Sequence, residues 1–165
     1  MSSLQRISPC LWFDDQAEEA ARLYTSIFPN SRIGRVTRYG EAGREFHRKP
    51  PGSVMTVEFV LDGQPFTALN GGPVFKFNEA ISFQIDCEDQ GEVDFYWARL
   101  GEGGDPAAQQ CGWLKDRFGV SWQVVPAMLP ELLDGGDNAA GQRVMQALLK
   151  MKKLDIETLR RAREA

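Results

Sequence analysis

Apolar and polar positions alternate along several short stretches of the chain, which is the pattern of strands with one buried face. From residue 54 to 61 every odd-numbered position is apolar, while the even-numbered positions are mixed. Asp62-Gly63 then favours a tight hairpin turn, so residues 64–69 are predicted to return as the next strand. A mostly apolar run at residues 7–13 predicts a buried opening strand.

After this opening strand, apolar residues recur at the spacing of a helix. Asp15 and Glu18, three residues apart, are expected to cap the start of a helix, and Pro29 is expected to follow its end. Residues 32–39 are predicted as an exposed strand, and residues 40–52, rich in Gly, Pro and charge, as a mobile loop. The apolar face of the helix is formed by Ala17, Ala20, Ala21, Tyr24, Ile27 and Phe28.

The second half of the chain repeats this order. Residues 81–87 alternate as a strand, and an apolar stripe at residues 90–100 predicts a helix after it. Residues 110–115 and 120–125 are predicted to form a hairpin, and residues 139–165 two helices. The strand–helix–strand order therefore recurs with its third strand compressed, which indicates an internal repeat of one supersecondary unit.

We therefore expect an α+β fold in a single domain over residues 1–165. Its parts are a first βαβββ module at residues 5–78, a second and compressed module at residues 79–128, and a helical C-terminal tail at residues 129–165. Asp155 is expected to cap the second helix of that tail.

Charge and composition exclude several classes of function. The 165 residues carry 19 Lys and Arg against 23 Asp and Glu, a net charge of −4, so no nucleic-acid partner is expected. No apolar run is long enough to span a membrane and the start lacks a signal-peptide pattern, so we expect a cytoplasmic protein without a membrane partner. Three distant cysteines and a single histidine, His47, predict neither a disulfide framework nor a His-rich metal centre within one chain.

Five stretches of the chain are specific enough to indicate a family: ISPCLWFDDQAEEAARLYTSIFPNS, GSVMTVEFVLDGQPFTALNGGP, FKFNEAISFQIDCEDQGEVDFYWARL, CGWLKDRFGVSWQVVP and MQALLKMKKLDIETL. They resemble the PhnB-like branch of the vicinal oxygen chelate superfamily, which includes glyoxalase I, bleomycin-resistance proteins and extradiol dioxygenases. Members of this branch often carry the label 3-demethylubiquinone-9 3-methyltransferase. The resemblance implies two paired βαβββ modules that form an open, curved mixed sheet around a small-molecule pocket, and commonly a homodimer.

Active superfamily members hold a metal with four strand residues, and the resemblance carries these onto Pro9, Ala68 or Asn70, Ala80 or Ser82, and Gln123. Of these, Gln123 and Asn70 are the candidates for ligation, and neutral amide oxygens are weak ligands for a transition metal. We therefore expect the superfamily metal site to be lost and predict no cofactor, although a divalent metal stays an open alternative.

If the apolar strand faces pack on the helices, the opposite faces line the groove. Glu58 is then the best candidate catalytic residue, because a carboxylate in a pocket can serve as a general base; the simpler interpretation is an exposed strand carboxylate. Trp113 either walls the pocket or belongs to the core, and Cys111 is expected to pack. His47 is either a solvated loop residue or part of a lid. The predicted ligand-binding residues are Thr56, Glu58, Phe66, Asn70, Gln84, Trp113 and Gln123.

The predicted function is that of a glyoxalase/bleomycin-resistance-like protein that binds a small aromatic or apolar molecule in a barrel groove. One alternative is a divalent-metal-dependent lyase or dioxygenase-type enzyme with ligands from unexpected residues: Glu58, Gln84, Gln123 and His47. A second is the methyltransferase of the branch's label, which would need a glycine-rich turn leading into a helix, and residues 70–73 are not followed by a helical pattern. A third is a structural module whose groove is filled by side chains.

The expected partners are a small-molecule ligand and a second copy of the chain. The tail carries an apolar stripe that includes Val144, Leu148 and Met151. This stripe has two interpretations: it docks onto the chain's own fold, or it forms a dimer contact.

Overall fold

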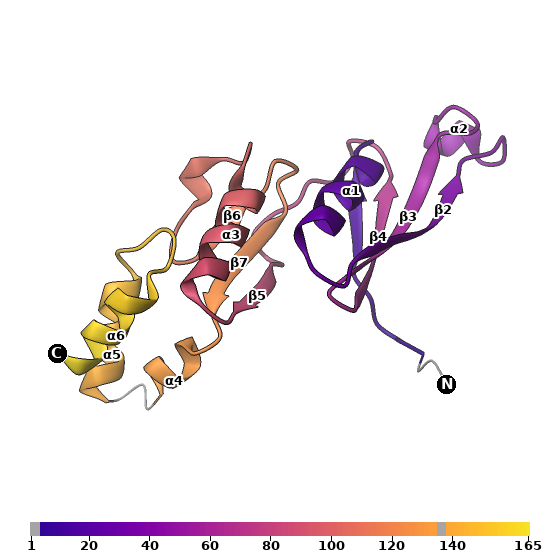
Figure 1. Cartoon of the computed structure of the whole chain (residues 1–165). Coiled ribbons are helices and arrows are strands. Elements are labelled where there is room, and N and C mark those ends of the chain that lie inside the picture. The colour runs from indigo at the N-terminus through magenta and orange to yellow at the C-terminus, as the bar shows by residue number, and fades with distance from the viewer. Residues whose placement is uncertain (1–3, 135–137) are drawn as a thin grey trace. The chain divides into compact units, whose positions relative to one another are not determined.

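The computed structural model describes residues 4–134 and 138–165, and the chain folds as two compact units, residues 1–77 and 78–165 (Figure 1). Each unit has its own mixed sheet, and the second unit also contains the helical C-terminal segment. This confirms the predicted α+β class.

The first unit is a four-stranded sheet with one helix packed on it. Strands β1 (Cys10–Phe13), β2 (Arg32–Arg38), β3 (Val54–Leu61) and β4 (Gln64–Asn70) lie in the order β1-β4-β3-β2. β1 runs parallel to β4, and the other two pairs are antiparallel. Helix α1 (Ala17–Ile27) follows β1, and the single turn α2 (Arg44–His47) lies between β2 and β3. The opening strand is shorter than the predicted run of residues 7–13.

The core of the first unit confirms the alternation predicted for β3. Val57 and Phe59 are buried and Glu58 between them is exposed, because successive strand residues point to opposite faces. Phe59 stacks on Phe66 of β4 with ring centroids 5.3 Å apart. Tyr24 of α1 is buried beside Phe59, with ring centroids 6.2 Å apart, so the helix covers this face of the sheet.

The hairpin between β3 and β4 forms as predicted. Asp62 and Gly63 both have positive φ, 46° and 82°, which is the conformation that a two-residue primed turn requires. The turn therefore sets the register that pairs Phe59 with Phe66 and Glu58 with Thr67.

The start of α1 differs from the prediction of an Asp15–Glu18 capping pair. Gln16 is the N-cap residue and its side chain makes no capping hydrogen bond. Instead, the backbone N–H of Ala17 donates to Oδ1 of Asn70, at 2.8 Å, from the end of β4. The cap is supplied by a residue that is distant in sequence, which local spacing does not reveal.

The second unit repeats this arrangement with three strands. β5 (Phe83–Cys87), β6 (Trp113–Lys115) and β7 (Ser121–Pro126) lie in the order β5-β7-β6, with β5 parallel to β7 and β6 antiparallel to it. Helix α3 (Gln90–Gly101) packs on this sheet, and its N-cap Asp89 accepts a hydrogen bond from the Glu92 N–H.

This order matches β1-β4-β3 of the first unit. Where β2 would follow the helix, the described chain of the second unit instead has an irregular segment with a short 3-10 helix, η1 (Pro106–Ala108). The strand without a counterpart is therefore β2, the second strand of the first unit, whereas the third strand, β3, corresponds to β6, which has three residues against the eight of β3.

The C-terminal segment holds α4 (Leu129–Leu133), α5 (Ala139–Leu148) and α6 (Ile156–Glu164), of which α4 was not predicted. Asp155 caps α6, as expected, by accepting a hydrogen bond from the Thr158 N–H at 2.7 Å. Figure 1 shows α5 and α6 side by side in the second unit. The two helices and the segment between them bury a cluster of four side chains: Val144, Leu148, Leu154 and Leu159. Part of the predicted stripe therefore packs on its own chain.

Among the helices that the structure describes, none is both long enough and apolar enough to cross a membrane.

Candidate functional site

The face of the first sheet opposite α1 carries two of the predicted site residues, Thr56 and Glu58. Thr56 is half-buried and its hydroxyl pairs with that of Thr37 on β2. Glu58 is exposed at the centre of β3. The cross-strand row that contains Thr56 continues through Leu69 to Trp12 of β1, so a tryptophan shares this face.

Trp12 is a residue that sequence reasoning left out of the site. Its indole N–H donates to the Gly72 carbonyl at 2.9 Å, and its ring lies against Gly71. Phe75 contacts it edge-on, with ring centroids 4.9 Å apart. Leu11 and Phe13, the neighbours of Trp12 in β1, are buried, and side chains alternate between the two faces of a strand. This alternation in the sequence could have predicted that Trp12 lies on the other face.

Phe66 and Asn70, expected beside Thr56 on the groove face, instead lie on the face covered by α1. The hairpin register pairs Phe66 with the buried Phe59, and Asn70 follows at the same parity along β4. They are 6% and 7% exposed. The three apolar residues within 66–69 include even-numbered and odd-numbered positions, which point to opposite faces of β4. The sequence of β4 therefore does not define which face is buried.

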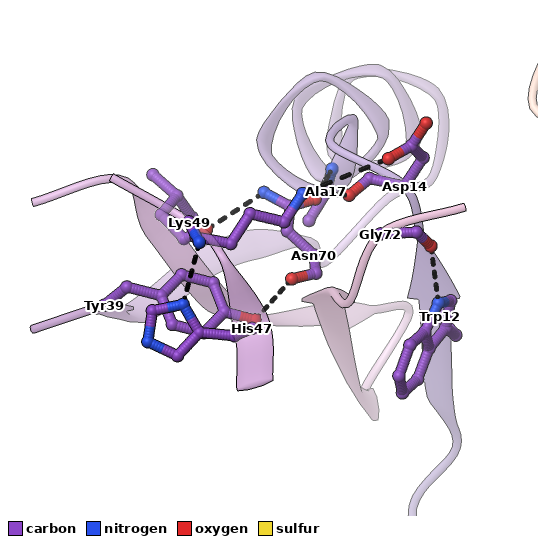
Figure 2. A network of polar contacts seen from close by, with 9 residues as sticks. Trp12, Asp14, Ala17, Tyr39, His47, Lys49, Asn70 and Gly72 are labelled. Atoms are coloured by element: carbon purple, nitrogen blue, oxygen red, sulfur yellow. Dashed lines mark hydrogen bonds and ion pairs between the residues drawn. The ribbon is translucent and has the colours of Figure 1, made fainter. Parts of the chain in front are cut away.

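Asn70 connects three elements of the first unit through its polar atoms (Figure 2). Its Oδ1 accepts from the Ala17 N–H, and its Nδ2 donates to the Val54 carbonyl at 3.1 Å. Its backbone carbonyl accepts from the Tyr39 hydroxyl, whose pKa is raised by partial burial. Because its amide oxygen and nitrogen are both used within the protein, the contacts of Asn70 are those of a structural residue.

His47 holds the loop between β2 and β3 in a defined conformation (Figure 2). Its Nδ1 accepts from the Lys49 backbone N–H at 2.9 Å, so Nε2 is the protonated nitrogen of the neutral ring and donates to the Ala42 carbonyl at 3.2 Å. The ring packs on Tyr39 with centroids 4.4 Å apart. The side chain of Lys49 donates to the Asp14 carbonyl at 3.2 Å, which ties the loop to the end of β1.

Two hollows of the first unit meet at Lys49. One of about 380 Å³ is bounded by Asp15, Lys49 and Asn70, and another of about 450 Å³ by His47, Lys49 and Gly71. Both are open and polar at their rims, and neither includes Thr56 or Glu58.

In the second unit, three predicted site residues come together on the sheet face opposite α3. Gln84, Gln123 and Trp113 form one cross-strand row through β5, β7 and β6. The Gln123 amide nitrogen donates to the Ser82 hydroxyl at 2.9 Å, and that of Gln84 lies 3.5 Å from the Gln123 amide oxygen. These bonds link the two amides, and Gln123, the central one, is the direct cross-strand neighbour of Trp113.

A cavity of about 400 Å³ opens at the Trp113 end of this row. Of the residues that line it, Trp113 alone was among the predicted site residues; Cys111 and Ser121 were not. Ser121 lies two residues before Gln123 on β7 and pairs with Lys115 of β6, so strand parity was the signal that would have placed it on the same face.

The four positions expected for the superfamily metal do not present a fitting donor set. Ala68 is buried and has no donor, and the amides of Asn70 and Gln123 are hydrogen-bonded within the protein. Across the residues that the structure describes, no three His, Cys, Asp or Glu side chains are grouped so as to hold a metal ion. Both ring nitrogens of His47 are engaged as well.

The repeated strand–helix–strand units, each with a helix packed on one face of its sheet, have the arrangement of the glyoxalase/bleomycin-resistance/dioxygenase fold of the vicinal oxygen chelate superfamily. The family described as 3-demethylubiquinone-9 3-methyltransferase matches residues 5–125, and the chain belongs to this family. The resemblance seen in the sequence is thereby confirmed.

Solved structures agree with this assignment. The chain is 34% identical to a protein of Bacillus cereus described as a 3-demethylubiquinone-9 3-methyltransferase, PhnB protein, with a TM-score of 0.63; the match covers 74% of this chain and all of that one. It is 23% identical to the protein PA1353 of Pseudomonas aeruginosa, with a TM-score of 0.56, over 75% of this chain and 98% of that one. No curated protein matches the chain.

Proposed function

We propose that this protein binds a small aromatic or apolar molecule on the polar sheet faces of its superfamily scaffold, without the superfamily's metal. The observation that carries the proposal is the Gln84–Gln123–Ser82 chain beside Trp113. Two amides oriented by hydrogen bonds next to an aromatic ring are the combination by which many ligand sites fix orientation and supply apolar contact.

The chemistry of the inherited donor positions supports the loss of the metal. Pro9 and Ala68 have no side-chain donor, and the two amides that remain are neutral ligands already bonded within the protein. The alternative with Glu58, Gln84, Gln123 and His47 as ligands gains no support, because the lone imidazole uses both nitrogens to hold its own loop.

Methyl transfer gains no support from the residues that the structure describes. The Asn70-Gly71-Gly72 turn leads into an irregular segment at residues 73–82, whereas the glycine-rich turns of nucleotide-cofactor sites lead into a helix N-terminus. A homodimer and a cytoplasmic location stay predictions; light scattering on the purified chain tests the first.

Two variants test the ligand face. Gln123→Leu removes the central amide of the row, and Gln64→Leu makes the same change at an exposed position of β4 as the control. With a panel of neutral aromatic fragments followed by NMR titration, we expect Gln123→Leu to weaken the fragments that bind the wild-type chain about tenfold and Gln64→Leu to leave them unchanged. Equal affinities for both variants would contradict the proposal.

Glu58 is tested separately. Glu58→Gln keeps the shape of the side chain and removes its charge, so a role in ligand binding or proton transfer predicts loss of fragment binding or turnover with the fold intact. An unchanged response would leave Glu58 as an exposed strand carboxylate.

The metal is tested directly by metal analysis of protein purified without chelators. We expect less than one equivalent of any divalent ion, and a stoichiometric ion would overturn the metal-free half of the proposal.

A further inference from the structure

The cavity at β6 in the second unit has a mostly apolar wall and a small number of polar groups. It has a volume of about 400 Å³, within the range of pockets that hold small organic molecules. Trp113 and Leu114 come from β6, and Ala108 and Cys111 from the irregular segment before it. The polar lining residues are Glu79, Gln110, Lys115 and Ser121.

Ser121 has an unmet hydrogen-bonding group in this wall. It is 2% exposed, and its Oγ is buried without a hydrogen-bond partner within the described chain. A buried hydroxyl without a partner is costly, and native proteins normally satisfy such groups. Ser121 is a lining residue of the cavity, so a rotation of its side chain about χ1 is the movement by which a ligand seated there can reach the hydroxyl and supply the missing bond.

Asp116, the neighbouring buried polar side chain, differs from Ser121 because both of its carboxylate oxygens have hydrogen-bond partners. Asp116, in the same hairpin, is 3% exposed and accepts hydrogen bonds from the backbone N–H groups of Phe118 and Val120. Its second oxygen accepts from the Trp122 indole N–H at 2.9 Å. The hairpin is therefore built to satisfy its buried carboxylate, while the hydroxyl that borders the cavity is left without a bond.

The charges at the cavity compensate each other. The Lys115 ammonium forms an ion pair with Glu79, and the hydrogen bond from Lys115 lowers the pKa of the Glu79 carboxyl. One cation and one anion in contact leave no net charge for an ionic ligand to neutralise. This lining favours an uncharged ligand.

The wall that carries Cys111 is fixed by backbone hydrogen bonds. The N–H groups of Cys111 and Gly112 donate to the carbonyls of Met151 and Lys152, both at 2.8 Å, and Gly112 accepts from the Val124 N–H. A Cβ at Gly112 would lie 3.1 Å from the Val124 carbonyl oxygen, so a glycine is needed at this close approach, where φ is +86°. The C-terminal tail therefore fixes the backbone at Cys111, which lines the cavity.

We propose that this cavity binds an uncharged molecule with an apolar body of about one ring and a hydroxyl or similar group that pairs with Oγ of Ser121. The inference rests on the proposed function, because it names the ligand class for the site of the second unit. Trp113 supplies the aromatic wall, and Cys111, which also packs against the apolar cluster of the C-terminal helices, lines the cavity, where a bound ligand shields it.

Matched probes test the hydroxyl pairing on the full chain. Benzyl alcohol and ethylbenzene have nearly the same shape and differ by a hydroxyl in place of a methyl group, and benzoate adds a charge. By NMR titration we expect benzyl alcohol to bind roughly three- to tenfold more tightly than ethylbenzene, the effect of one net hydrogen bond. Ser121→Ala should reduce this ratio to about one, while Ser26→Ala, at an exposed hydroxyl of α1, should leave it unchanged.

The three free cysteines supply a positional readout. With iodoacetamide and peptide mass spectrometry, benzyl alcohol at saturation should slow alkylation of Cys111 and leave that of the exposed Cys10 unchanged. Cys87 is buried and reports any unfolding caused by the probe. This measurement needs no variant, so it applies even if Ser121→Ala fails to fold.

Three results would overturn the inference: no protection of Cys111 by either probe, equal affinities of benzyl alcohol and ethylbenzene for the wild-type chain, or tighter binding of benzoate. These failures are distinguishable from failure of the proposed function. If Gln123→Leu still weakens another fragment, the chain binds small molecules by its amide row and only the cavity inference is wrong.

Discussion

Asn70 is the residue whose replacement most directly tests how the first unit is held together. Asn70→Ala removes the oxygen that caps α1 through the Ala17 N–H and the N–H group that satisfies the Val54 carbonyl. Loss of a helix cap costs about 0.5–2 kcal/mol, and loss of the donor to the half-buried Val54 carbonyl adds roughly 1 kcal/mol. We therefore expect the free energy of unfolding of this unit to fall by about 1.5–3 kcal/mol.

The assay is a urea titration followed on the NMR amide signals of residues 54–70, which report the first unit alone. With a urea slope of about 1–3 kcal/mol per M, the midpoint should fall by about 0.5–3 M. Hydrogen exchange of the Ala17 amide should accelerate as well, because its acceptor is gone. Asn78→Ala is the control, since Asn78 makes an equivalent bond to the Ala80 N–H at an exposed position.

One result would refute this reasoning. If Asn70→Ala leaves the urea midpoint within the error of the Asn78→Ala control but weakens fragment binding, Asn70 acts on a ligand, as the sequence predicted, and its contacts in the first unit contribute little stability.

Two further predictions concern local packing and pH. Gly71→Ala places a Cβ 2.2 Å from ring atoms of Trp12, so it should lower the urea midpoint of the first unit by an amount equivalent to about 1–3 kcal/mol, whereas Gly40→Ala, in open space, should not. The hydrogen bonds from Thr158 lower the pKa of Asp155 in the folded chain, so its stabilising contribution is present above pH 3.8, the ordinary carboxyl value, and is lost as the pH falls through the lower folded value. Urea midpoints between pH 5 and pH 2.5 should therefore decline more for the wild-type chain than for Asp155→Asn; parallel curves would contradict this assignment.

The elements that depend on local chemistry could be predicted from the amino-acid sequence alone. The alternation of residues 54–61 and the Asp62-Gly63 turn define β3 and its hairpin, because side-chain period and positive φ are properties of neighbouring residues. The cap of α6 at Asp155 is local for the same reason. The family resemblance, which extends over most of the chain, supplied the order of the modules.

Part of the candidate site was also within reach of the sequence. Gln84 and Gln123 were predicted to share a face, since each lies at an outward position of an alternating strand, and the structure brings them into one row. Phe66 and Asn70 were placed on the wrong face of β4, because residues 66–69 do not alternate clearly and the hairpin register decides which parity is buried.

The contacts between residues that are distant in sequence became visible in the folded chain and not before. The cap of α1 comes from Asn70, 53 positions beyond Ala17, and His47 is held by Tyr39 and by its own loop rather than exposed on it. The unmet hydroxyl of Ser121 is a property of everything packed around it. A hydrogen bond depends on where its partners lie in space, and chain folding brings together groups whose spacing along the sequence carries no sign of the contact.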